Sequence, residues 1–146
     1  MINIRSADLE DLPAIIDLVV ELAVFEKEPE AVTASLKQYE DAFKEGVFEA
    51  LVAEKQGFII GMAVYYMTWS TWKGKMLYLE DLYVKESERK LGVGQKLFSA
   101  FLKEAKAKKA ILAKWQVLDW NDPAINFYLK NEAAIEKNWW NVKKYI

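Results

Sequence analysis

The sequence predicts an α/β fold in which a mixed, mostly antiparallel sheet is flanked by about four helices. Three observations support this fold class. Apolar residues in the middle of the chain, from Phe48 to Val84, alternate with the period of two that is typical of strands. Apolar residues before and after this region recur with the helical period. A further strand-like run at residues 111–118 follows a helical segment, so we expect parallel neighbours only there.

The first third of the chain predicts one strand followed by two helices. Residues 1–7 alternate Ile2 and Ile4 with polar residues. Acidic residues then favour a helix start, and Pro13 fits the first turn of that helix. Its apolar face consists of Leu12, Ile15, Ile16, Val19, Leu22 and Ala23. We expect the second helix to begin after Thr33, its N-cap candidate, and to stop at Gly46.

The rest of the chain predicts an antiparallel meander and then two more helices. The meander consists of strands at residues 48–54, 58–69 and 76–84. Helices are expected at residues 94–108 and 121–129, the second with Pro123 in its first turn. The aromatic tail, residues 134–146, is expected to close the sheet as a last strand. Because no repeat or linker interrupts the pattern, residues 1–146 are predicted to form a single domain.

The composition restricts the available chemistry. The chain has 146 residues, and 53% of them are hydrophobic, which suffices for one sizeable core. Its net charge of −2 argues against a nucleic-acid partner bound by a basic surface. The absence of Cys and His excludes Cys nucleophiles, disulfides, Cys/His zinc sites and Ser–His pairs. We therefore expect no metal, and catalysis by carboxylates, Tyr, Lys, hydroxyls or backbone amides.

No segment has the pattern of a targeting signal or a membrane anchor. The most apolar early run, residues 12–25, contains Asp17 and Glu21 and follows no basic stretch. It is typical of an amphipathic helix rather than of a signal peptide or a membrane span. We expect a cytoplasmic protein without a membrane partner.

Two adjacent acids, Glu80 and Asp81, interrupt an apolar and aromatic strand. Strict alternation would place Glu80 on the face of Tyr78. It would place Asp81 on the opposite face, that of Leu79. At least one acid then needs a cationic partner, hydrogen bonds or a raised pKa. Two interpretations remain open: a carboxylate that holds or deprotonates an ammonium group, or a structural acid paired with Lys or Arg.

A glycine motif with the sequence RKLGVG, residues 89–94, lies between that strand and the next helix. Its two glycines allow a tight turn that directs N–H groups toward an anion at the helix start, and Arg89 and Lys90 add positive charge. The motif lacks the Gly-Lys-Ser/Thr of a P-loop and the third glycine of a dinucleotide fingerprint. An ordinary glycine-rich helix start is the alternative, but the position after an acid-bearing strand favours a pyrophosphate site.

A third segment ends a strand and starts a short helix at Asn121 or Asp122, with Tyr128 about two turns further on. Such a Tyr is most often a core residue with its hydroxyl at the surface. In a chain without His or Cys it is also the obvious proton donor for an anionic leaving group. The spacing leaves both interpretations open.

Together, and in this order, the three segments resemble the Gcn5-related N-acetyltransferase (GNAT) family. Residues 89–94 are similar to its pyrophosphate-binding motif, Arg/Gln-x-x-Gly-x-Gly/Ala. Longer strings resemble the diamine acetyltransferase branch, that of the spermidine/spermine and thialysine N-epsilon-acetyltransferases. They cover residues 21–26, 65–66, 70–74, 78–84, 117–121 and 127–128.

The resemblance implies that acetyl-CoA is the cosubstrate. Its pantetheine arm would extend like an added strand along Leu82, Tyr83 and Val84. Its pyrophosphate would bind the turn and helix start formed by Arg89, Lys90, Leu91, Gly92, Val93, Gly94 and Gln95. The start of the last helix would contact the same arm through Asn121, Asp122, Pro123 and Ala124.

The resemblance also implies two catalytic residues. Tyr128 matches the general acid that protonates the departing CoA thiolate. Glu80 matches the residue that recognises the acceptor amine and helps to deprotonate it, although it could be an anchor only. Phe25 and Glu26 match positions that line the acceptor site. Neighbouring acids and aromatic residues, Trp72 among them, would make that site suited to a cation.

The implied reaction is direct acetyl transfer, in a ternary complex, to a primary amine of a polyamine or of a thialysine- or lysine-like substrate. The alternatives are a protein or peptide N-acetyltransferase and a non-catalytic CoA-binding sensor or structural dimer. The branch also implies a homodimer.

Lys90 and Glu132 stand where the branch usually has glycine. A positive φ at Lys90 would cost roughly 1 kcal/mol.

Overall fold

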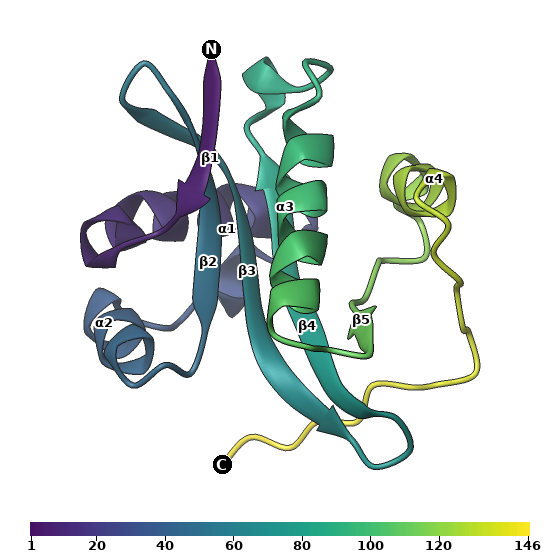
Figure 1. Ribbon diagram of the computed structural model, residues 1–146. Coiled ribbons are helices and arrows are strands. Elements are labelled where there is room, and N and C mark those ends of the chain that lie inside the picture. Colours follow the sequence, from purple (N-terminus) through teal and green to yellow (C-terminus); the bar gives the residue numbers. More distant parts are fainter. The chain divides into compact units, whose positions relative to one another are not determined.

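The structure of the chain, a computed structural model, describes residues 1–146. It contains two compact units, Met1–Gln116 and Val117–Ile146, and each is described by itself. The second unit carries one helix, α4 (Asp122–Lys130). The first unit carries, in chain order (Figure 1), β1 (Ile2–Ser6), α1 (Leu12–Phe25), α2 (Leu36–Lys44), β2 (Glu49–Lys55), β3 (Phe58–Ser70), β4 (Gly74–Val84), α3 (Val93–Ala107) and β5 (Leu112–Lys114).

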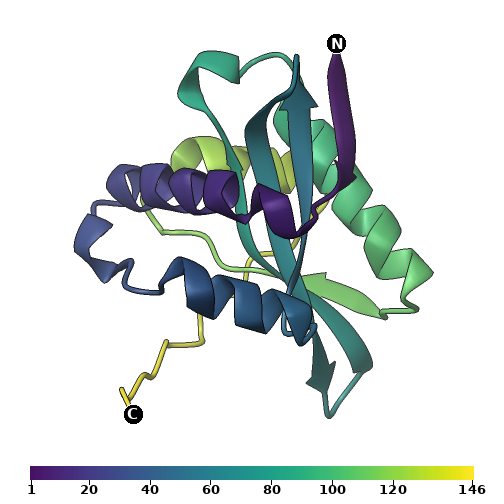
Figure 2. The same cartoon turned by 90° about the vertical axis from the view of Figure 1, so that its left-hand side faces the viewer.

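The strands form one sheet in the order β1-β2-β3-β4-β5. Every neighbouring pair is antiparallel except β4 and β5, which run parallel because the chain crosses over through α3 between them. The predicted mixed sheet is therefore confirmed, and so is the place of its parallel pair. Figure 2 shows α1 and α2 on one face of the sheet and α3 on the other.

Each face of the sheet has its own apolar layer. Under α1, the buried residues are Leu12, Ile15, Leu18, Ala50, Val52, Met62, Val64 and Tyr83. On the other face, Phe101 of α3 packs against Tyr65 of β3, with 5.6 Å between the ring centroids. Phe98 packs edge-on against Trp115 at 5.3 Å. Burial of a side chain of this size stabilises the fold by roughly 1.5–3 kcal/mol, so these layers fix β3 and β4 in place.

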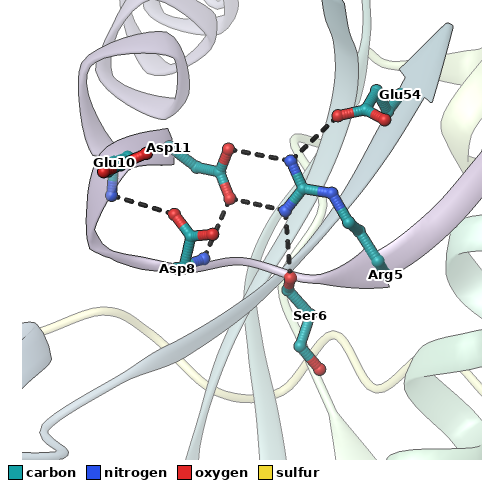
Figure 3. Close-up of polar contacts among 6 residues, drawn as sticks. All are labelled: Arg5, Ser6, Asp8, Glu10, Asp11 and Glu54. Carbon is teal, nitrogen blue, oxygen red and sulfur yellow. Dashed lines mark hydrogen bonds and ion pairs between the residues drawn. The ribbon is translucent and has the colours of Figure 1, made fainter. Parts of the chain in front are cut away.

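A polar network ties the first strand to the start of α1. Figure 3 shows the Arg5 guanidinium between the carboxylates of Asp11 and Glu54. Asp8 caps the short 3₁₀ turn Leu9–Asp11, and its side chain accepts a hydrogen bond from the backbone N–H of Glu10. The acidic start predicted for the first helix is thus confirmed, with Pro13 in the first turn of α1.

The predicted N-cap of the second helix is wrong. α2 begins after Ser35, whose hydroxyl accepts a hydrogen bond from the backbone N–H of Gln38. The Gln38 side chain in turn accepts one from the backbone N–H of Ser35. This reciprocal capping box needs Glu or Gln three residues after the cap. Thr33 has Leu36 at that position, so it cannot form one.

Two predicted strands differ from the structure near the C-terminus. β5 covers only Leu112–Lys114, instead of residues 111–118, and its last pair with β4 is Lys114 with Tyr78. Residues 134–146 form no strand, so the tail does not close the sheet. Trp140 and Val142 remain 90% and 92% exposed. Alternating apolar residues form a strand only where another backbone offers hydrogen-bonding partners.

Candidate active site

β4 contains a bulge at Glu80. Leu79 pairs with Tyr65 of β3, and Asp81 pairs with Val64, the preceding residue of β3. Glu80 lies between these two pairs and has no partner across the ladder. An extra residue of this kind bends the strand and turns its side chains to new directions.

The bulge brings Asp81 to the face of the sheet that α1 covers. Asp81 lies opposite Val64, which belongs to the core under α1. Leu79 lies opposite Tyr65, whose ring packs against Phe101 on the other face. The prediction that Asp81 and Leu79 share a face is therefore wrong. The physical reason is that one inserted residue reverses the alternation beyond it.

Three carboxylates, Glu26, Glu80 and Asp81, lie near one another on this face; we call them the carboxylate cluster. Burial, together with the negative charges of Glu80 and Glu26, raises the pKa of Asp81 to about 7. Burial also raises the pKa of Glu26, the C-cap of α1. Tyr39 of α2 is close enough that burial and the two β4 carboxylates raise the pKa of its hydroxyl. Such a cluster favours a bound cation.

One carboxylate oxygen of the cluster accepts a hydrogen bond from a tyrosine. The Tyr66 hydroxyl of β3 donates a hydrogen bond to Oε1 of Glu80 at 2.8 Å. The Tyr66 ring stacks on Tyr78 of β4, with 5.4 Å between centroids. Sequence reasoning missed both Tyr66 and the position of Asp81. The paired acids and the paired tyrosines were visible in the sequence, but the contact between them depends on the bulge.

β4 and β5 pair over only three residues and then separate. The last pair is Tyr78 with Lys114. From Leu79 to Val84, β4 has a partner strand on the β3 side only. Backbone groups along such an edge can hydrogen-bond an extended ligand as an added strand would. The predicted pantetheine positions, Leu82, Tyr83 and Val84, all lie on this stretch.

The glycine turn leads directly into α3. Gly92, the N-cap of α3, has φ +77°, and no atom lies within 4 Å of the position that a Cβ would occupy there. The first N–H groups of a helix have no partner inside the helix. The turn therefore presents the N–H groups that begin α3 beside open space at Gly92, as an anion site requires. Lys90 has φ +69° and Glu132 has φ +64°, so both residues that replace the usual glycine adopt the left-handed conformation.

Arg89 joins the end of β4 to the end of α1. Its Nε donates a hydrogen bond to the carbonyl oxygen of Val84 at 2.9 Å. Its guanidinium lies over the ring of Tyr83, at 5.1 Å, and over the ring of Phe25, at 5.7 Å. These residues border a cleft of about 400 Å³ lined by Val20, Glu21, Val24, Phe25, Tyr83, Glu86 and Arg89.

The structure does not bring every predicted acceptor residue together. Glu26 lies in the carboxylate cluster, and Phe25 lies beside it in the chain, under Arg89. Trp72 is in the turn between β3 and β4 and is 83% exposed. Glu80 is six residues after Gly74, where β4 begins. At the usual rise per residue of a strand, this corresponds to a distance of about 20 Å along β4. Within one chain, Trp72 therefore lies far from the cluster.

The second unit carries the other predicted residues. Asn121 caps α4, and its side chain accepts a hydrogen bond from the backbone N–H of Ala124. Asp122 and Pro123 form the first turn of α4, as predicted. Tyr128 lies in the same helix, and its ring makes an edge-on contact with Phe127 at 5.5 Å.

Neither a metal site nor a membrane span is found. No three or more Asp or Glu side chains are arranged so that they could hold a metal ion. None of the four α-helices combines the length and the apolar character that crossing a bilayer requires.

A mixed sheet in which β4 and β5 separate beside a glycine turn is typical of the N-acyltransferase fold. The chain belongs to the acetyltransferase (GNAT) family, whose model matches residues 12–132. It is therefore an enzyme of the acyltransferase class. Acetyl-CoA is the acetyl donor that this family uses.

Comparison with other proteins supports the family and the branch. The chain is 37% identical to thialysine N-epsilon-acetyltransferase of Bos taurus, over 87% of this chain and 81% of the relative. It is 31% identical to human spermidine/spermine N(1)-acetyltransferase-like protein 1, over 94% of this chain and 21% of that protein. An aminoglycoside acetyltransferase from an uncultured soil sample shares the fold, with a TM-score of 0.83 at 19% identity, over 99% of this chain and 96% of that one.

Proposed function

We propose that the protein transfers the acetyl group of acetyl-CoA to a primary amine of a small cationic substrate, namely a polyamine or a thialysine- or lysine-like amine. The observation that carries this proposal is the carboxylate cluster, which lies on the part of β4 that has no partner on its β5 side. Relatives named for thialysine and spermidine/spermine acetylation support the same substrate class.

The ion pairs found within residues 1–116 leave the cluster out. None of them includes Glu26, Glu80 or Asp81. Burial raises the pKa of Asp81 to about 7, and the negative charges of Glu80 and Glu26 add to this effect. An ammonium group of the substrate would supply the missing positive charge. The cluster therefore favours a cationic amine over a neutral one.

The proposed chemistry uses proton transfers at two side chains. Acetyl-CoA supplies a thioester whose carbonyl carbon accepts the amine. Glu80 takes a proton from the substrate ammonium, directly or through one water molecule. The neutral amine forms the new C–N bond as the C–S bond breaks, and Tyr128 gives its proton to the leaving sulfur. The nitrogen of the acetylated product then loses its extra proton, which returns to the Tyr128 phenolate through water, and Glu80 releases its proton to solvent. Backbone N–H groups near the splay would polarise the carbonyl, and no covalent intermediate on the enzyme is needed.

We further propose that residues 1–146 act as a single domain and that the protein is a cytoplasmic homodimer. The family model spans both compact units, which supports a single functional domain. Trp139 and Trp140 of the tail are 66% and 90% exposed, and large exposed apolar side chains are frequent at subunit interfaces.

A thiol-release assay with acetyl-CoA tests the function. We expect turnover with at least one of spermidine, spermine, thialysine and lysine, and loss of most of it in Glu80→Gln. Turnover of a lysine-containing peptide but of no free amine would indicate the protein-acetyltransferase alternative. Tight acetyl-CoA binding without turnover of any amine would indicate the sensor and would overturn the proposal.

A further inference from the structure

We propose that Tyr66 is a positioning residue for Glu80: its hydroxyl holds Oε1, so that Oε2 is the oxygen left for the acceptor amine. This inference rests on the proposed amine acetyltransferase function and adds to it a residue that does not itself touch the substrate. It follows from the geometry of the bulge and of the neighbouring tyrosines.

Glu80 has little else to fix its side chain. It is exposed, it has no partner residue across β3, and it forms no ion pair. A free Glu side chain samples many rotamers, and ordering it costs conformational entropy. The 2.8 Å hydrogen bond from Tyr66 is the side-chain hydrogen bond that Glu80 makes. It engages Oε1 and leaves Oε2 without a partner in the chain.

Tyr66 is a rigid donor. It lies opposite Tyr78 in the regular part of the β3–β4 ladder. The two rings stack at 5.4 Å with 26° between their planes, which limits rotation of the Tyr66 side chain. Burial and the Glu80 carboxylate both raise the pKa of Tyr66, so its hydroxyl keeps its proton at neutral and alkaline pH. The donor is therefore present at neutral pH.

Proton transfer from an ammonium group needs the accepting oxygen within hydrogen-bond distance and correctly oriented. Displacement by 1 Å can cost about a hundredfold in rate. A hydrogen bond that selects one rotamer of Glu80 should therefore raise kcat more than it improves binding of acetyl-CoA, whose proposed contacts lie further along β4 and in α3.

The test begins with Tyr66→Phe, which removes the hydroxyl and keeps the ring. We expect roughly a tenfold fall in kcat with the preferred amine and a KM for acetyl-CoA within about twofold of wild type. Tyr78→Phe is the matched control, because it removes a hydroxyl from the stacked partner ring without touching Glu80. It should keep wild-type kcat. Thermal unfolding of both variants checks that the fold is intact.

A double-mutant cycle with Glu80→Ala separates positioning from a structural role. Once Glu80 is absent, Tyr66→Phe should lower kcat by less than about twofold. The same tenfold loss with and without Glu80, or wild-type kcat in Tyr66→Phe, would overturn the inference while the enzyme remains an amine acetyltransferase. Absence of turnover in the wild-type protein would instead overturn the proposed function and, with it, this inference.

Discussion

Arg5 of β1 and Asp11, the residue before α1, form a bidentate ion pair. Nη1 of Arg5 lies 2.7 Å from Oδ2 of Asp11, and Nη2 lies 3.0 Å from Oδ1. Oδ2 also accepts a hydrogen bond from the backbone N–H of Asp8 at 2.9 Å. These hydrogen bonds hold the pKa of Asp11 below its usual value, against the opposing effect of its burial.

Asp11→Asn should therefore destabilise the fold at neutral pH by about 2 kcal/mol. Because the folded-state pKa is lowered, the contribution of Asp11 is present above the pKa of the unfolded chain, near 3.9, and is lost as the pH falls below it. Urea unfolding at pH 7 and pH 3 measures the difference, which should shrink at pH 3. Asp17→Asn, at an exposed position of α1, is the control and should change little.

Asp81 should show the opposite pH dependence. Its pKa of about 7 means that the folded chain keeps this proton at a pH where the unfolded chain has lost it. Stability should therefore fall as the pH rises from about 4 to about 7. Asp81→Asn removes this effect and should be more stable than wild type at pH 8. Exposed Glu30→Gln should behave as wild type. An unchanged pH dependence in Asp81→Asn would contradict the burial of this charge.

Lys90 allows charge and backbone strain to be separated. Lys90→Gly removes both the ammonium and the strained φ of +69°, and should stabilise the fold by up to about 1 kcal/mol. Lys90→Ala removes the charge and keeps the strain, so it should give no such gain. If the ammonium assists the pyrophosphate, both variants should raise the KM for acetyl-CoA, and more so at low salt. Equal stability of the two variants would rule out the strain.

A side chain at Gly61 of β3 should lower the stability of the fold. A Cβ there would lie 3.1 Å from the carbonyl oxygen of Tyr83 and 3.1 Å from Cδ1 of Leu97. Gly61→Ala should cost about 1–3 kcal/mol, measured by denaturant unfolding. Gly94→Ala is the matched change, since the nearest atom to its Cβ is Cγ2 of Val84 at 3.9 Å. A comparable loss in both variants would show that close packing is not the cause.

Tyr128→Phe tests the proposed general acid. Loss of the proton donor should lower kcat by about a hundredfold or more and leave the acetyl-CoA dissociation constant within about twofold. Tyr145→Phe, in the exposed tail, should leave both quantities unchanged. Full turnover in Tyr128→Phe would mean that another group protonates the thiolate.

Local patterns in the sequence predicted most of the elements. Period-two and helical spacing located the strands and helices of the first unit to within a few residues, because one buried face dictates that spacing. The left-handed conformation of Lys90 and Glu132 could be anticipated because glycine is usual at these positions in the branch. The missing strand at residues 134–146 could not, since apolar alternation does not show whether a partner edge exists.

The sequence by itself determined the order of the elements from β1 to α4, the glycine turn before α3 and the limitation of catalysis to carboxylates, tyrosine, lysine, hydroxyls and backbone amides. Only the tertiary structure decided which side chains meet. The bulge at Glu80 places Asp81 on the face of α1 and α2, where it joins Glu26. Tyr66, fourteen residues before Glu80, donates a hydrogen bond to the Glu80 carboxylate. A bulge depends on how two strands pair, and the alternation of one strand contains no information about its partner's register.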